Sequence, residues 1–242
     1  MPLTDMHPAQ IFDNMTDFFS SHAGHVALLS ALGYNGAKVS QELSEKIRII
    51  TSLGMSRISL DLVMTKTPML SCNKTAIIGK DIIVASRKWA RVASCMEGVT
   101  TLHCFAITLG RKLESLMEKM EKKSIFDAYA LDCFGSLFAE KVADELETML
   151  RNSLDKKGRR LSRRFSPGYC DWNLAEGQRA LSEVLLPGKI NVTFLPGGAM
   201  QPCKTVSGVM LSADVVHNPS PCSFCKDKTC RQRRSHKNDL PL

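Results

Sequence analysis

The sequence predicts a mixed fold of helices and strands, α+β or α/β, in one domain. Two hydrophobic patterns indicate this class: short runs that alternate apolar and polar residues, typical of half-buried strands, and longer runs with apolar residues three and four apart, typical of helices. The chain has 242 residues, 44% of them hydrophobic and 23% charged, as expected of a globular protein with a sizeable core. Strands and helices alternate irregularly, and no repeat or clear linker divides the chain.

The first half of the chain contains helices followed by strands. The first twenty residues show little pattern, and a short helix is predicted over 24–33, ended by Gly33. Ser40 has the side chain of a helix cap, so the next helix is predicted over 41–53. Strands are predicted over 57–65, 75–79 and, as a central strand, 99–108, with a turn and a helix start in GKDI (79–82).

The second half of the chain is richer in helix. Helices are predicted over 110–122, 124–153 and 174–187, the second being the longest pattern in the sequence. Strand candidates are 161–165, 190–196 and 204–214.

The net charge of +8 is concentrated in two segments. Residues 156–164 hold six basic side chains and no acid, and residues 226–237 hold six basic side chains and one acid. The rest of the chain is therefore slightly acidic, which argues against a uniformly basic nucleic-acid surface. The two segments could face an acidic protein, a phosphate or only solvent.

Targeting signals are not evident in the sequence. No run of 18 or more apolar residues suggests a membrane span, and residues 1–13 lack the pattern of a secretory signal. We therefore expect a cytoplasmic protein without a membrane partner. Nine cysteines in such a chain are expected to be reduced thiols or metal ligands.

The stretch RRFSPGYCDW (163–172) does not have the composition of ordinary scaffold. Pro167 restricts its own backbone and that of Ser166, and Gly168 permits a close approach that no side chain would allow. Tyr169 and Trp172 are flat and carry polar groups. Such a loop is a candidate for holding a small molecule.

Four sequence blocks together resemble the activation domain of cobalamin-dependent methionine synthase, and more closely its stand-alone short forms. The blocks are TLG (108–110), SLFAEKVADELE (136–147), RRFSPGYCDW (163–172) and GGAMQPCKTVSGV (197–209). Some short forms also share GKDI and a Cys-rich tail. The resemblance spans residues 28–234 and implies an α+β fold with a twisted, mostly antiparallel sheet and long helices packed around it.

The resemblance implies a role in repairing a cobalamin cofactor. Family members bind S-adenosylmethionine (AdoMet) and donate its methyl group to the cobalamin of a partner after one-electron reduction by a flavodoxin-like or ferredoxin-like donor. This chain would then be a methyltransferase component with no catalytic side chain of its own, because the reduced cobalt is the nucleophile. Its partner would be a corrinoid-binding methyltransferase, with methionine synthase as the first candidate.

The resemblance also implies four AdoMet-binding residues. Arg164 would hold the AdoMet carboxylate, Glu140 would attract the amino group, and Ser166 and Tyr169 would contact the ligand from the loop. The chain departs from the short forms at Cys170, where Gly is usual, and at Asn173, where Pro is common. The domain is assigned to residues 1–217 and a Cys-rich basic tail to 218–242.

The tail contains three cysteines, Cys222, Cys225 and Cys230, at a spacing suited to metal binding. The three cysteines could hold either Zn or an iron–sulfur cluster, and Cys203, His217 or His236 could supply a fourth ligand. A mobile tail without metal is the alternative.

Two other functions stay open. A Cys-rich metal-binding module for nucleic acid or protein would explain the tail but not the loop, so nucleic acid is the less favoured partner. A pure interaction subunit that has lost AdoMet binding would explain Cys170 and Asn173.

Two histidines are not expected to act at a site. The segment DMHPAQ (5–10) lacks the glycine of a corrinoid-binding motif, and His103 is expected to be a core histidine.

Overall fold

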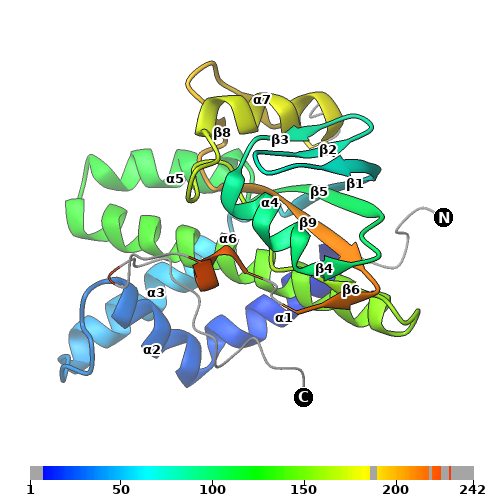
Figure 1. Cartoon of the computed structure of the whole chain (residues 1–242). Helices are drawn as coiled ribbons and strands as arrows, with labels where there is room; N and C mark the ends of the chain where they lie inside the picture. The colour runs from blue at the N-terminus through cyan, green and yellow to red at the C-terminus, as the bar shows by residue number, and fades with distance from the viewer. Residues whose placement is uncertain (1–7, 186–189, 218–219, 225–228, 230–242) are drawn as a thin grey trace.

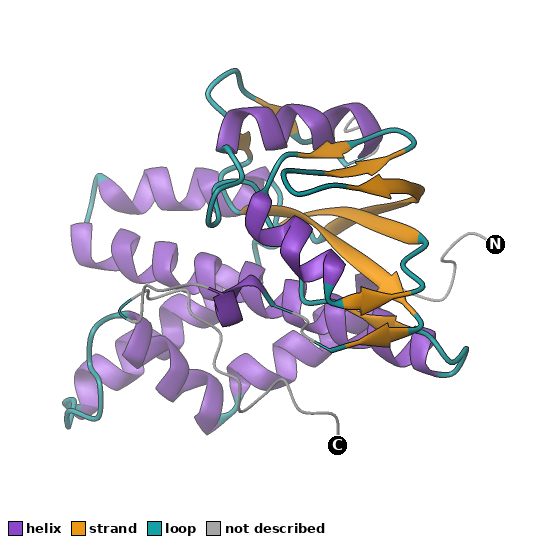
Figure 2. Ribbon diagram, in the orientation of Figure 1, coloured by secondary structure: helices purple, strands orange, loops and turns teal. Residues whose placement is uncertain are grey.

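The computed structural model describes residues 8–185, 190–217, 220–224 and 229. Its centre is a twisted six-stranded sheet with helices on both faces (Figures 1 and 2). The strand order is β3-β2-β1-β5-β9-β6, and every neighbouring pair runs antiparallel. The α+β class with an antiparallel sheet is thereby confirmed.

The main sheet consists of β1 (Asp61–Cys72), β2 (Ile77–Gly79), β3 (Ile83–Val84), β5 (Thr101–Thr108), β6 (Arg160–Leu161) and β9 (Thr205–Ala213). Two small pairs lie outside it, β4 (Met96–Glu97) with β10 (Val215–Val216) and β7 (Thr193–Phe194) with β8 (Met200–Gln201). The helices are α1 (Pro8–Ser20), α2 (His22–Ala31), α3 (Gln41–Met55), α4 (Arg87–Ser94), α5 (Arg111–Glu121), α6 (Ile125–Asp155), α7 (Leu174–Leu185) and the short 3-10 helix η2 (Pro221–Phe224).

The central strand β5 separates two hydrophobic cores. Successive side chains of a strand point to opposite faces. Phe105 and Ile107 pack with α1, α2, α3, α5 and α6, whereas Cys104 and Ala106 pack with α4 and α7. All four side chains are fully buried. The long helix α6 therefore lies on one face of the sheet and α7 on the other.

Most predicted elements are present, with shifted ends. Ser40 caps α3 as expected, accepting a hydrogen bond of 3.1 Å from the backbone N–H of Leu43. The helix start predicted in GKDI is wrong, because residues 80–82 form the turn of a hairpin that pairs Ile78 with Ile83. This hairpin extends the sheet and buries Ile77 and Val84, which a helix there would not do.

Two α-helices, α1 and α4, were not predicted. Helix α1 buries Ile11, Met15 and Phe19, a four-residue spacing that was a readable signal in the first twenty residues. Helix α4 begins after Ser86, whose hydroxyl accepts the backbone N–H of Trp89 at 3.0 Å. Among the described helices, none offers an apolar stretch long enough to cross a bilayer.

Candidate functional site

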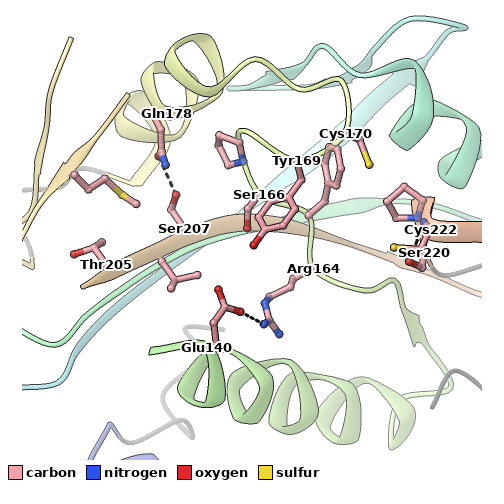
Figure 3. Close-up of a pocket in the computed structure, with 15 residues that line it drawn as sticks. Glu140, Arg164, Ser166, Tyr169, Cys170, Gln178, Thr205, Ser207, Ser220 and Cys222 are labelled. Carbon is pink, nitrogen blue, oxygen red and sulfur yellow. Dashed lines mark hydrogen bonds and ion pairs between the residues drawn. The ribbon is translucent and has the colours of Figure 1, made fainter. Parts of the chain in front are cut away.

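An open pocket of about 210 Å³ lies where α6, β9, the loop 163–172 and the segment 220–224 meet (Figure 3). All four residues predicted to bind AdoMet line it: Glu140, Arg164, Ser166 and Tyr169. Glu140 comes from α6 and the other three from the loop, so two of the sequence blocks converge here. The wall also contains apolar side chains, namely Phe165, Pro167, Met200 and Val206.

An aromatic stack fixes the loop to the sheet. The ring of Phe165 lies between those of Trp89 and Trp172, with centroid distances of 5.3 and 5.5 Å and interplanar angles of 10° and 8°. All three side chains are buried. Trp172 is therefore part of the core, whereas Phe165 and Tyr169 line the pocket.

Asp171 ties the far end of the loop to α4. One carboxylate oxygen accepts the hydroxyl of Ser86 at 2.6 Å, and the other accepts the backbone N–H of Arg87 at 2.9 Å. A carboxylate at a helix N-terminus also interacts favourably with the helix dipole. Within the loop, Gly168 has φ +85° and donates its N–H to the carbonyl of Trp172 at 2.9 Å. The loop is therefore closed on itself and anchored at both ends.

Two glycines let β9 and α7 approach the loop 163–172 closely. A Cβ at Gly208 on β9 would lie 2.8 Å from the carbonyl oxygen of Phe165. A Cβ at Gly177 on α7 would lie 2.8 Å from the ring of Pro167. Both distances are shorter than real contacts allow, so only glycine permits the observed packing. The backbone of Phe165 uses this approach to exchange hydrogen bonds with Val209.

The guanidinium of Arg164 forms ion pairs at the pocket wall. Its side chain is 4% exposed, and it donates to Glu140 at 2.7 Å and to Asp144. Burial works against the charged form, but the carboxylates of Asp144 and Glu140 outweigh it and raise the pKa of Arg164. Figure 3 shows the pair of Arg164 and Glu140 side by side below Tyr169.

The resemblance implies that Arg164 holds a ligand carboxylate and Glu140 attracts its amino group, and these roles stay predictions. In the structure the two side chains pair with each other. Glu140 and Asp144 are 43% and 51% exposed, so both carboxylates reach solvent, whereas the side chain of Arg164 is buried.

Glu147 anchors the start of the loop beneath the pocket. Its side chain is 2% exposed and accepts hydrogen bonds from Arg151 at 3.0 Å, from Arg163 at 2.9 Å and from the backbone N–H of Arg164 at 3.1 Å. Together with Glu140 and Asp144, it follows the spacing of four and three residues that places side chains on one helix face. The block 136–147 therefore supplies an acidic stripe that receives the arginines of the loop.

Sequence reasoning missed several residues of the pocket. Ser207 donates to the amide oxygen of Gln178 at 2.9 Å, and both side chains are buried at the pocket wall (Figure 3). The block 197–209 indicated β9, but a single sequence did not show which of its side chains face a ligand. Ser220 and Cys222, which the sequence analysis assigns to the tail, also line the pocket.

The structure describes one of the three cysteines predicted to bind a metal. Cys222 lies at the pocket, whereas Cys225 and Cys230 lie outside the described residues. Within the described part of the chain, no group of three or more His, Cys, Asp or Glu side chains is arranged to hold a metal ion. Metal binding by the three cysteines therefore stays a prediction. His103 is 1% exposed and lies 3.1 Å from the hydroxyl of Ser212, as expected of a core histidine.

Comparison with known proteins identifies a solved structure with the same fold. No protein-family model and no curated protein matches the chain. A solved structure described as the MetH reactivation domain bound to AdoHcy matches it with a TM-score of 0.54, over 77% of this chain and 70% of that one. The fold is that of the MetH reactivation domain. Sequence identity is 13%, so the likeness concerns the fold, and the ligand AdoHcy belongs to the other protein.

Proposed function

We propose that the protein binds AdoMet in the pocket below Tyr169 and serves as a reactivation module for a cobalamin-dependent methyltransferase, with methionine synthase as the first candidate. The observation that carries the proposal is the convergence of Glu140, Arg164, Ser166 and Tyr169 on one pocket. These residues come from two separate sequence blocks, and the fold is shared with a domain that binds AdoHcy, the product left when AdoMet loses its methyl group.

The charges at the pocket wall suit a zwitterionic amino-acid group. AdoMet carries one carboxylate, one ammonium group and one sulfonium. Glu140 contributes a carboxylate to the pocket wall and Arg164 a guanidinium, so the pocket offers one group of each sign to the carboxylate and ammonium of the ligand. The apolar wall suits the remainder of the molecule.

The size of the pocket favours a ligand that stays partly exposed. About 210 Å³ is less than the roughly 300–1,000 Å³ of pockets that enclose a whole drug-sized molecule. A nucleoside-sized ligand would therefore extend into the mouth. An exposed methyl group is what transfer to a separate protein requires.

The proposed reaction uses the protein for positioning. An external flavodoxin-like or ferredoxin-like donor reduces the partner's cob(II)alamin by one electron to cob(I)alamin. The cobalt then attacks the methyl carbon, the carbon–sulfur bond breaks, and methylcobalamin and AdoHcy result. The chain contributes orientation of AdoMet, a contribution that can be worth several kcal/mol of the barrier.

Reactivation of a partner tests this function. A methionine synthase that lacks its own reactivation domain is converted to the cob(II)alamin form and mixed with this protein, AdoMet, flavodoxin and a reductant. We expect the cob(II)alamin absorption to be replaced by that of methylcobalamin only when AdoMet and this protein are both present. Equal conversion without this protein would contradict the proposed role.

The variant Glu140→Gln provides a site-specific comparison in the same assay. It removes the carboxylate charge of Glu140 at the pocket wall, so we expect slower conversion at limiting AdoMet. Glu145→Gln is the matched control, because Glu145 lies on the same helix but bonds to Asn14 outside the pocket. The control is expected to react at the wild-type rate.

A further inference from the structure

Two cysteines from distant parts of the sequence line the same pocket. Cys170 follows Tyr169 in the motif loop, and Cys222 belongs to η2 in the C-terminal segment. Both are reduced. Figure 3 places them on one side of the pocket, with the Cys170 side chain above and that of Cys222 beside Ser220. The sequence shows them as two unrelated features, a departure in a loop and the first cysteine of a tail.

The segment that carries Cys222 is docked against α4 and the pocket. Ser220 is 2% exposed, and its hydroxyl accepts the backbone N–H of Cys222 at 3.2 Å. The guanidinium of Arg91 lies 4.3 Å from the ring centroid of Phe224, a cation–π contact at the end of η2. Residues 220–222 therefore form a wall of the pocket, and Cys222 is held at that wall.

The Cys170 thiol is also fixed at the pocket. Its backbone has φ +54°, and its neighbour Asp171 is bonded to the N-terminus of α4. The loop is further held by the stack of Phe165 with Trp89 and Trp172. Because Cys170 is exposed while it lines the pocket, reagents from solvent reach it without a change in the loop.

We propose that Cys170 and Cys222 form a thiol-modification site that controls occupancy of the pocket. The modifying class is a small disulfide such as oxidised glutathione. A protein thiolate attacks one sulfur of the reagent, the reagent's S–S bond breaks, and a mixed disulfide forms while the released thiolate takes up a proton. The protein sulfur is oxidised and the released half of the reagent is reduced, so no further oxidant is needed.

The geometry makes adduct and ligand compete for the same space. A tripeptide attached to either cysteine would occupy or cover a pocket of about 210 Å³. By reciprocity, a bound ligand disfavours the adduct at equilibrium by the same free energy by which the adduct weakens ligand binding. A ligand that fills the pocket also shields the two thiols sterically. The inference rests on the proposed function only in its choice of ligand.

Thiol footprinting tests the shielding. The reduced full-length protein is pulsed with N-ethylmaleimide with and without saturating AdoHcy, and labelling of each cysteine is read by peptide mass spectrometry. We expect AdoHcy to slow labelling of Cys170 and Cys222 at least fivefold. Cys203, exposed, and Cys95, half-buried, do not line the pocket and serve as matched controls with unchanged rates.

Binding after modification tests the control of occupancy. The protein is treated with oxidised glutathione until mass spectrometry shows adducts on Cys170 or Cys222, and AdoHcy affinity is compared with that of the reduced protein. We expect a loss of at least tenfold in the wild type, reversed by dithiothreitol. In the double variant Cys170→Ser, Cys222→Ser, the ratio of treated to untreated affinity should be near one.

The outcomes separate this inference from the proposed function. If the fully reduced protein binds neither AdoMet nor AdoHcy, the proposed function fails and this inference with it. If AdoHcy binds but fully modified protein binds equally well, or labelling is unaffected by ligand, only the thiol control is overturned.

Discussion

Glu147 fixes the backbone of Arg164: its buried carboxylate accepts the Arg164 N–H at 3.1 Å, while Arg151 and Arg163 donate to the same side chain. The loop 163–172 thus begins at a bond to α6 and ends at the bond of Asp171 to α4. Between these anchors, Ser166 and Tyr169 are presented to the pocket. Pre-ordering of this kind lowers the entropic cost of holding a ligand.

Replacing Glu147 by Gln should therefore strongly destabilise the fold. The change removes one partner of a buried charge network and leaves Arg163 and Arg151 without their counter-ion at that position. Breaking such networks costs on the order of 3 kcal/mol. Urea denaturation measures the effect, with Glu145→Gln as the control on the same helix. A loss below about 1 kcal/mol would show that the network does not hold the loop.

Cys170 carries a backbone conformation that favours glycine. Its φ of +54° lies in the left-handed region, which is costly for residues with a Cβ. We expect Cys170→Gly to raise the free energy of unfolding by about 1 kcal/mol, whereas Cys170→Ala keeps the strain and gives no such gain. Thermal or urea unfolding distinguishes the two. Equal stability of the Gly and Ala variants would contradict the argument.

Gly208 is predicted to be indispensable for the contact between β9 and the loop. In Gly208→Ala the new methyl group would meet the carbonyl of Phe165, which is backbone and cannot turn away. We expect a loss of roughly 2–3 kcal/mol in stability and weaker ligand binding. Gly197→Ala is the control, since a Cβ there meets no atom within 4 Å. Similar behaviour of the two variants would rule out this role for Gly208.

His103 should make stability depend on pH. Burial, with Lys66 and Arg159 nearby, lowers the pKa of His103 from 6.5 to about 4. The folded state therefore keeps the ring neutral while the unfolded chain takes up a proton below about pH 6.5. The free energy of unfolding should fall as pH drops from about 6.5 to 4, by up to roughly 3 kcal/mol.

The variant His103→Gln isolates this contribution. Glutamine can still bond to Ser212 but does not titrate, so the slope between pH 6.5 and 4 should be smaller than in the wild type. Subtracting the two urea-derived stability curves removes the contribution of the other histidines. Parallel curves would show that His103 is protonated alike in both states.

Local patterns made much of the fold predictable. The cap at Ser40 and the apolar spacing of residues 41–53 are local signals, so α3 could be predicted from neighbouring residues alone. The same holds for the long helix α6. The GKDI segment was misread because Lys80 and Asp81 suit either a turn or a helix start. In the structure the segment forms a turn, because Ile78 of β2 pairs with Ile83 of β3.

The candidate site was predictable only where motifs carried it. Arg164, Ser166 and Tyr169 lie in one short block, so their proximity followed from the sequence. The pairing of Arg164 with Asp144 and the presence of Cys170 and Cys222 at one pocket depend on tertiary packing that no local pattern encodes. The sequence therefore presents the tail as a separate motif, whereas its residues 220–222 line the pocket.

Calorimetric titration of the reduced protein with AdoMet measures whether this pocket binds the ligand. We predict a dissociation constant in the micromolar range, which corresponds to a binding free energy of about −8 kcal/mol. Glu140→Gln should lower the affinity only about fivefold, because Glu140 is partly exposed and solvent screens its charge. Glu145→Gln should leave it unchanged. Absence of heat and of any thermal shift at millimolar AdoMet would contradict the claim, as would equal affinities of the wild type and Glu140→Gln.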